Sequence, residues 1–435
     1  MLNTVLGGSF MKTCLVNLAY LDPAQIGGVG RIAHEVSRLL ATHAVDARVI
    51  FIVSWRFAGE FAGWLGQSAV VVPFITSRDL RLTLRLLKPD VLVSPLFGLE
   101  PFSNSSALHV AGMPDALALD HPELFTPADL AYRQQVYAHL TQAFRVVTLT
   151  EHARTQLLHH LTLPPEKIAV VPLGAEPQVS IQTTDVPDLP AQYIFYPANV
   201  WPHKRHDLLM RIFGLLCQQQ PDLHLIMTGG RSAENRQHLQ ALAAQYKCPP
   251  ERIHDLGYVD DSTLIALYRH AQALLFVSQY EGFGMPLLEA MQHGCPVICA
   301  PLAAIPEVVG DAAIYVDSDQ PDEWVKAILT TLPQERSRLI QAGRERAAQF
   351  TWAKTRDGWQ RVLSESGLRF SAEPVQNQTA VRQLAARMQP LLEQVTQLSR
   401  LTAHSRARQI VFLPRLILLQ VRLLWLARGY GMKAP

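Results

Sequence analysis

Short apolar runs alternate along the chain with longer stretches in which apolar residues recur at helical spacing. Apolar runs of about four to eight residues, bounded by polar or turn residues, are typical of strands that are buried on both faces of a parallel sheet. Helices between such strands would make the first half of the chain a doubly wound α/β domain. There we expect strands at Cys14–Ala19, Ala47–Val53, Val70–Phe74, Val91–Ser94, Ala107–Ala111, Arg145–Thr148 and Lys167–Val171.

A second alternating series follows a stretch, Leu173 to Gln192, that has little periodicity and is rich in Pro and Asp, as interdomain linkers often are. Its strands are expected at Tyr193–Tyr196, Leu223–Met227, Ala273–Val277, Pro296–Cys299 and Ala313–Val316. The pattern predicts an N-terminal Rossmann-like domain at residues 1–180, a linker at 181–192, a C-terminal Rossmann-like domain at 193–355, a crossover helix at 356–370 and a helical tail at 371–435.

Composition fits this organisation. A chain of 435 residues with 49% hydrophobic residues can form two α/β cores of ordinary size plus an appendage. The five cysteines form no CxxC pair and no Cys/His metal spacing, so reduced and mostly buried thiols are expected. The N-terminus lacks the pattern of a signal peptide, which favours the cytoplasm.

The tail differs from the rest of the chain in charge. Residues 371–435 hold nine Lys/Arg against two Asp/Glu, a balance of +7, which leaves −5 for the remainder of a chain whose net charge is +2. The tail also carries apolar residues at heptad spacing, interrupted by Pro390. These residues are Val381, Leu384, Met388, Leu391, Val395 and Leu398.

The segment Ile410 to Ala427 is nearly all apolar, and Arg408, Arg415 and Arg422 recur every seven residues along it. A cationic stripe on an apolar helix favours peripheral binding to an anionic membrane surface, whereas two central arginines and Pro414 make a spanning helix costly. The alternative is a helix docked on its own protein or on a second subunit, which would make a homodimer.

The most informative motif is EGFGMPLLE, which places Glu281 and Glu289 eight residues apart across a glycine-rich turn. Pro286 is suited to the first turn of a helix, so we expect Glu281 on the turn and Glu289 in the helix. Gly282 and Gly284 allow close approach of a ligand, and free N–H groups at a helix start favour a phosphate. One carboxylate can hold sugar hydroxyls and the other a ribose; the competing interpretation is a solvated loop with two chance glutamates.

Two further motifs suit phosphate. Lys204, in the phrase YPANVWPHKRHDLLM, follows the first strand of the second domain and is expected to reach a diphosphate; a solvated Lys-Arg pair is the alternative. Gly28, in GGVGR, is expected to open a helix and approach a donor phosphate or an acceptor, with a plain structural turn as the alternative. Read as Gly28-x-Gly30-x-x-Ala33, the same loop fits a dinucleotide fingerprint, but no acid follows the second strand to hold a ribose.

From about Lys12 to about Ser366 the chain resembles the retaining glycosyltransferases of family 4, and the segment around EGFGMPLLE matches their C-terminal domain closely. The resemblance implies a GT-B fold, in which two Rossmann-like domains face a cleft. It also implies a hexosyltransferase that transfers a sugar from a nucleotide sugar to a glycan or lipid-linked glycan, as in polysaccharide and lipopolysaccharide biosynthesis, with no protein nucleophile. The phrase PANVWPHK favours a mannosyltransferase that uses GDP-mannose.

The resemblance implies roles for residues at matching positions. Glu281, Lys204 and Asp115 would be catalytic, and Pro114 stands where the family has a histidine. Asn199 replaces an arginine that usually accompanies the lysine, with Arg205 as a substitute. Thr150-Glu151 would line the acceptor side, and Glu307 would cap or brace the helix behind the donor pocket. The expected donor-binding residues are Glu289, Gly282, Phe283, Gly284, Met285, Asn199, Arg205 and Gly28.

No cofactor and no metal are expected. The string Asp317-Ser318-Asp319 matches a metal-binding DxD, but its place before a helix predicts that Asp317 or Ser318 is an N-cap. No nucleic-acid partner is expected. Two other function classes remain open: a non-catalytic scaffold on the transferase fold, suggested by Asn199 and Pro114, and a nicotinamide oxidoreductase, suggested by the loop at Gly28.

Overall fold

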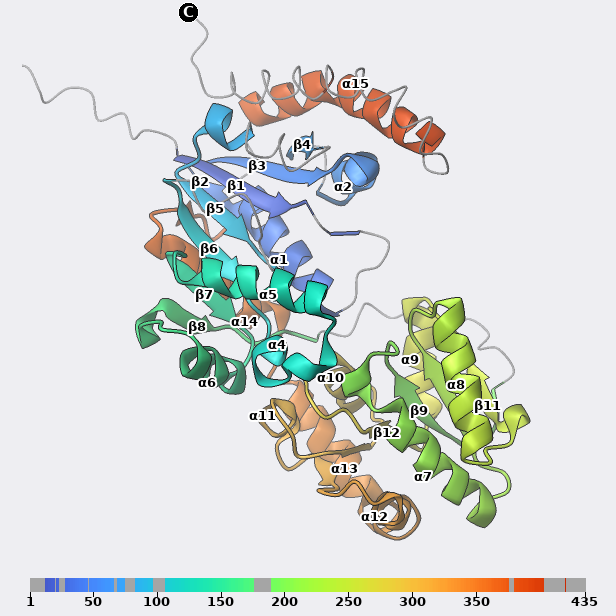
Figure 1. The fold of residues 1–435 in the computed structure, drawn as a ribbon. Helices are drawn as coiled ribbons and strands as arrows, with labels where there is room; N and C mark the ends of the chain where they lie inside the picture. The colour runs from blue at the N-terminus through green and yellow to red at the C-terminus, as the bar shows by residue number, and fades with distance from the viewer. Residues whose placement is uncertain are drawn as a thin grey trace, which may run out of the picture.

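The computed structural model describes residues 12–19, 21–22, 28–45, 47–65, 69–74, 83–96, 106–175, 189–374, 379–402 and 419. Within these residues the chain forms two large parallel sheets with helices packed around them, one in each half of the chain (Figure 1). The expected doubly wound α/β architecture is therefore confirmed. The five cysteines are free thiols, and four of them are buried.

The first sheet has the strand order β4-β3-β1-β5-β6-β7-β8, and its neighbouring strands are parallel. Each of the seven predicted runs is a strand, with ends within two residues of the prediction. The order reverses between β1 and β5, which makes their carboxyl ends a switch point where ligands commonly bind. The strands are β1 (Lys12–Leu18), β3 (Ala47–Ser54), β4 (Val70–Phe74), β5 (Val91–Ser94), β6 (Leu108–Gly112), β7 (Arg145–Thr148) and β8 (Ile168–Val170).

The second sheet has the order β11-β10-β9-β12-β13-β14, also parallel, with its switch point between β9 and β12. Its strands are β9 (Tyr193–Pro197), β10 (His224–Thr228), β11 (Ile253–Asp255), β12 (Ala273–Phe276), β13 (Val297–Cys299) and β14 (Ala313–Tyr315). The edge strand β11 was not predicted, because it is only half-buried and carries one apolar residue.

Helices join the strands and cover the sheets. In the first domain they are α1 (Gly28–His43), α2 (Ala58–Leu65), α4 (Leu117–Asp120), α5 (Pro127–Leu140) and α6 (Glu151–His160), with short turns η1 (Trp55–Phe57), η3 (Pro122–Leu124) and η4 (Pro165–Lys167). In the second they are α7 (His206–Gln219), α8 (Ala233–Gln245), α9 (Asp261–His270), α10 (Met285–Gln292), α11 (Ile305–Val309), α12 (Pro321–Lys326) and α13 (Leu332–Ala347), with the turns η5 (Pro202–Lys204) and η6 (Pro250–Arg252) and the π-helical η7 (Ala327–Thr331).

Side-chain caps begin several of these helices: Thr126, Thr150, Ser232 and Asp260 each accept a hydrogen bond from a backbone N–H in the first turn. The predicted cap of α12 was wrong. The N-cap is Gln320, and the Ser318 hydroxyl instead accepts from the Gln320 amide in the preceding turn.

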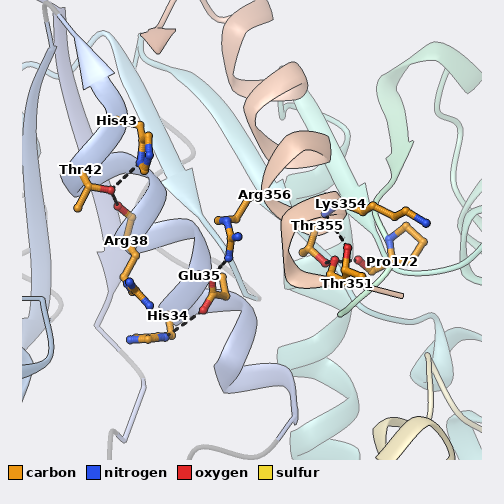
Figure 2. A network of polar contacts seen from close by, with 10 residues as sticks. All are labelled: His34, Glu35, Arg38, Thr42, His43, Pro172, Thr351, Lys354, Thr355 and Arg356. Atoms are coloured by element: carbon orange, nitrogen blue, oxygen red, sulfur yellow. Dashed lines mark hydrogen bonds and ion pairs between the residues drawn. The ribbon is translucent and has the colours of Figure 1, made fainter. Parts of the chain in front are cut away.

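After the second domain the chain returns to the first through α14 (Trp352–Glu365). Arg356 of α14 donates to Glu35 of α1 at 2.9 Å, and the Thr355 hydroxyl donates to the Pro172 carbonyl at 2.8 Å (Figure 2). The short strand β15 (Arg369–Phe370) then pairs with β2 (Ala44–Val45) at the end of α1. The C-terminal segment is thus fastened to the first domain at several points.

The long helix α15 (Thr379–Thr402) packs against η1, α2 and β4 of the first domain (Figure 1). Its heptad positions Met388, Val395 and Leu398 are buried there, and Pro390 lies inside the helix. This part of the tail therefore docks on the chain's own first domain, which is one of the alternatives that the sequence left open. Arg408, Arg415 and Arg422 lie outside the described residues, and among the described helices none is long and apolar enough to cross a membrane.

Replacing glycine by alanine should have opposite effects on stability at two helical positions, Gly214 and Gly63. A Cβ at Gly214 in α7 would lie 2.3 Å from the Tyr246 carbonyl oxygen, whereas a Cβ at the exposed Gly63 in α2 would meet no heavy atom within 4 Å. Gly63→Ala should stabilise the protein by up to about 1 kcal/mol through helix propensity, and Gly214→Ala should destabilise it by about 1–3 kcal/mol through the clash. Denaturant unfolding of both variants measures this; equal stabilisation would contradict the packing of α7 against Tyr246.

Candidate active site between the two domains

Lys204 and Glu281 meet at the switch point of the second sheet. Lys204 ends η5, which follows β9, and Glu281 lies in the loop that follows β12. The Lys204 ammonium donates to Glu281 Oε1 at 2.5 Å, and the two side chains are only 12% and 10% exposed. The Tyr196 hydroxyl donates to the Lys204 carbonyl, and the ammonium lies 5.8 Å from the centre of the Phe276 ring. Two aromatic residues, Tyr196 and Phe276, therefore help to fix the position of Lys204.

The loop after Glu281 leads directly into α10. Gly284 is the N-cap of that helix with φ of 91°, a conformation that favours glycine, and Pro286 lies in its first turn. Glu281 on the turn and Glu289 in the helix agree with the prediction. Phe283 and Met285 have buried side chains, and the Phe283 ring packs 5.8 Å from that of Phe350, so any ligand contact at Phe283 would come from its backbone.

The predicted ribose ligand Glu289 is engaged at both oxygens. Arg31 of α1 donates to Oε1 at 2.9 Å, and the Tyr268 hydroxyl of α9 donates to Oε2 at 2.9 Å. Burial raises the pKa of the Glu289 carboxyl, an effect that the Arg31 cation and the Tyr268 hydroxyl oppose. Gly28, the predicted phosphate-contacting glycine, is the first residue of the same helix as Arg31.

Asp115 of the first domain approaches the same loop. A Cβ on Gly282 would lie 2.8 Å from Asp115 Cβ and 2.7 Å from the Pro114 carbonyl oxygen, so only glycine fits at this contact. Asp115 Oδ1 accepts from the Leu117 amide at 3.0 Å. Burial raises the pKa of the Asp115 carboxyl, and the charges of Glu281 and Lys204 both act on it. The structure thus brings together the three residues predicted to be catalytic.

Asn199 and Arg205 have other partners. Asn199 Oδ1 accepts from the Gly230 amide at 2.8 Å, which ties the loop after β9 to the loop after β10. Arg205 adopts φ of 54° and donates to Asp319 at 2.9 Å. The acid Asp319 is therefore in an ion pair, and within the described residues no group of three or more metal-ligating side chains occurs. For Asn199 and Arg205, donor binding stays a prediction.

The two histidines near Pro114 in sequence lie in different settings. His109 Nε2 lies 3.0 Å from the Ser94 hydroxyl inside the first sheet, and burial lowers its pKa to about 4. His121 Nδ1 lies 3.0 Å from Glu123 Oε1, and its ring lies 5.5 Å from that of Tyr280. His109 thus belongs to the first sheet, whereas His121 lies next to Tyr280, the residue before Glu281.

Several hydrogen bonds cross between the domains. The Thr150 hydroxyl donates to the Gly282 carbonyl at 3.1 Å, which places Thr150 beside the glycine-rich turn. Glu307 of α11 accepts from the amides of Glu151 and His152 at 2.8 and 3.1 Å. Glu307 does cap a helix, but that helix is α6 of the first domain.

Tyr280, just before Glu281, adds a further bridge. Its hydroxyl donates to Asp120 Oδ2 at 2.7 Å, and Asp120 Oδ1 lies 2.8 Å from His160 Nε2. Asp120, Tyr280, Tyr268 and Arg31 were not identified as site residues from the sequence. Arg31 lies within the GGVGR motif, but nothing in the sequence indicates its partner.

A cavity of about 200 Å3 lies at the switch point of the first sheet. It is lined by Asn17 and Leu18 of β1, by Met113 two residues before Asp115, and by Arg133 and Tyr137 of α5 among others. The walls are mainly apolar, and the Arg133 charge also acts on Asp115. The cavity therefore adjoins the Asp115 side of the site.

Comparison with known proteins identifies the second domain. Residues 186–346 match the family model for glycosyl transferases group 1. The chain is 28% identical over 249 residues to O-antigen chain mannosyltransferase B of Escherichia coli. This alignment covers 53% of the chain and 63% of that protein. It is 29% identical over 229 residues to D-inositol 3-phosphate glycosyltransferase of Corynebacterium glutamicum, covering 47% and 53%. The matches thus span about half to six-tenths of these relatives.

Solved structures share the fold. HepE from Anabaena, solved with UDP and glucose, aligns with a TM-score of 0.64 and 17% identity over 81% of this chain and all of that one. Sucrose-phosphate synthase from Thermosynechococcus elongatus aligns with a TM-score of 0.64 and 16% identity over 81% and 98%. The predicted fold is confirmed, since the chain has the GT-B fold, and the match of residues 186–346 to the family model for glycosyl transferases group 1 agrees with the predicted relationship.

Proposed function

We propose that the protein is a retaining hexosyltransferase that moves a sugar from a nucleotide-sugar donor to a glycan or lipid-linked glycan. The observation that carries the proposal is the buried Lys204–Glu281 pair, which lies at the start of α10 and faces Asp115 of the other domain. Mannose is the proposed sugar and GDP-mannose the proposed donor, supported by the mannosyltransferase among the relatives. A neighbour in fold was solved with UDP and glucose, so the tests of donor binding use both GDP and UDP.

The proposed chemistry assigns each end of the donor to one part of the site. Glu281 holds hydroxyls of the transferred sugar, Glu289 holds the ribose, and the diphosphate lies between them at the N-terminus of α10. The Lys204 ammonium and the N–H groups of the helix start stabilise the negative charge that grows on the departing diphosphate. Because these groups supply positive charge and donors, the proposed reaction needs no metal and no cofactor.

Retention follows from the proposed direction of attack. The acceptor hydroxyl would approach the anomeric carbon on the face that the diphosphate leaves, and a phosphate oxygen would take its proton. Asp115, on the acceptor side, faces this region from the first domain. The cavity beside it, with apolar walls and the Arg133 cation, is the proposed place for part of the acceptor.

The tail is proposed to place the enzyme at the inner face of an anionic membrane. The support is the sequence of Ile410 to Ala427 with its regularly spaced arginines, together with α15, which fastens the preceding segment to the first domain. A lipid-linked acceptor would then be presented to an enzyme that stays in the cytoplasm. Homodimer formation through the tail is the alternative.

Substitutions at the two glutamates should affect different kinetic constants. Glu281→Ala should lower kcat by about 100-fold or more, because contacts to the reacting sugar change in the transition state. Glu289→Ala should instead raise donor KM, with a smaller loss of kcat, because ribose contacts change little during transfer. Steady-state kinetics with a nucleotide-sugar panel measures both, with the exposed Glu323→Ala as the control. Wild-type turnover in Glu281→Ala would contradict the proposed role of Glu281.

Removing the tail beyond α15 should separate membrane binding from folding. A chain ending after Thr402 keeps α15 on the first domain and should bind nucleotide normally, but should no longer sediment with anionic vesicles. The full chain should sediment at low salt and be released by salt, because each arginine near an anionic leaflet contributes about 1 kcal/mol. The matched control replaces Arg408, Arg415 and Arg422 together by Gln in the full chain, which removes these charges and keeps the length of the tail. A full chain that ignores anionic vesicles, with a solution mass that falls on truncation, would contradict membrane binding and support a dimer.

A further inference from the structure

We propose that Arg31 is a positioning residue for the donor. From the first domain it holds the side chain of Glu289, the carboxylate of the second domain that takes the ribose. The inference rests on the proposed function and extends it. It makes the donor site a composite of both domains, since one ligand of the nucleotide is oriented by a side chain of the opposite domain.

The geometry supports this role. Arg31 lies in the first turn of α1, and its Nη1 donates to Glu289 Oε1 at 2.9 Å while Nη2 lies 3.6 Å from Asp261 Oδ1. Tyr268 holds the second oxygen of Glu289 at 2.9 Å. The Glu289 side chain is only 14% exposed, so solvent screens the attraction between the two charges only weakly. The carboxylate therefore has one preferred orientation.

Arg31 and Tyr268 leave room for a ligand. An ionised carboxylate offers about four lone-pair sites, and the two hydrogen bonds use two of them. Two sites remain for ribose hydroxyls, which are donors when they meet a carboxylate. Arg31 thus need not leave Glu289 before a nucleotide binds.

The groups around Glu289 shift its pKa in opposite directions, and the charge of Arg31 is one of them. Burial raises the Glu289 pKa and the Asp261 carboxylate raises it further, whereas Arg31 and the Tyr268 hydroxyl lower it. His293, whose ring stacks on Tyr268, is held mainly neutral because burial lowers its pKa to about 4. The charge of Arg31 therefore opposes the rise in the Glu289 pKa that burial causes. Without it the carboxyl would keep its proton to higher pH and lose acceptor sites for the ribose.

The test measures nucleotide affinity of the full chain by calorimetric titration with GDP and, separately, with UDP at pH 6 and pH 8. Arg31→Gln should weaken binding of the preferred nucleotide by about 10-fold at pH 8, the cost of about 1.4 kcal/mol, and by a larger factor at pH 6. Arg31→Lys keeps the cation and should recover most of the affinity and the normal pH dependence. Arg38→Gln removes a positive charge further along the same helix and is the control.

A double-mutant cycle shows whether Arg31 acts through Glu289. In a Glu289→Gln background, Arg31→Gln should have almost no further effect, since the carboxylate it serves is gone. If Arg31→Gln binds like Arg38→Gln, or weakens binding equally at both pH values, or keeps its full effect in the Glu289→Gln background, the inference is overturned. Melting temperatures accompany each variant. If Arg31→Gln unfolds, a folded Arg31→Lys that loses the affinity or the normal pH dependence overturns the inference.

Failure of the proposed function gives a different pattern. If the unaltered protein binds neither GDP nor UDP, or if Glu289→Gln binds nucleotide as tightly as the unaltered protein, the assignment of Glu289 to the ribose is wrong and the inference falls with it. If Glu289→Gln weakens binding and Arg31→Gln does not, only the role of Arg31 is contradicted.

Discussion

A buried ion pair between Lys204 and Glu281 joins the two loops that leave β9 and β12, and the geometry of the site depends on it. Each charge stabilises the other, because a buried charge that loses its partner costs several kcal/mol. Paired, they leave an ammonium and a carboxylate at the carboxyl edge of the sheet, beside the N-terminus of α10. A ligand that is anionic at one end and rich in hydroxyls at the other matches this arrangement.

The site is also a product of how the domains meet. Gly282 accepts the close approach of Pro114 and Asp115, Glu307 caps α6 across the interface, and Tyr280 donates to Asp120. Each domain contributes residues from the carboxyl edge of its own sheet to these contacts. The C-terminal helices α14 and α15 return to the first domain and add a second connection between the halves.

Much of this could be predicted from the sequence because parallel strands are buried on both faces and therefore appear as continuous apolar runs. The turn at Glu281 and the helix at Glu289 were predictable for a similar local reason, since Gly284 and Pro286 restrict the backbone there. One local signal was assigned to the wrong residue, at the start of α12. The cap of α12 is Gln320 because Ser318 serves the preceding turn and its carbonyl accepts from Trp324.

Pairs distant in sequence could not be predicted at all. Arg31 and Glu289 are 258 positions apart, and only the arrangement of two domains brings them together. The same holds for Glu307, whose own helix gave no indication that it would cap α6. The apolar stripe of α15 was visible in the sequence, but a stripe does not say which surface it covers.

The most direct test of the account compares nucleoside diphosphate with monophosphate binding in the presence of EDTA. If Lys204 and the start of α10 hold a diphosphate without metal, GDP should bind at least about 10-fold more tightly than GMP, or UDP than UMP, because charge-assisted contacts to the second phosphate are strong. Lys204→Ala should narrow that difference, while Lys326→Ala on the surface should leave it unchanged. Equal affinity for the diphosphate and the monophosphate, or a difference that Lys204→Ala does not reduce, would contradict the assignment of this site to a sugar nucleotide.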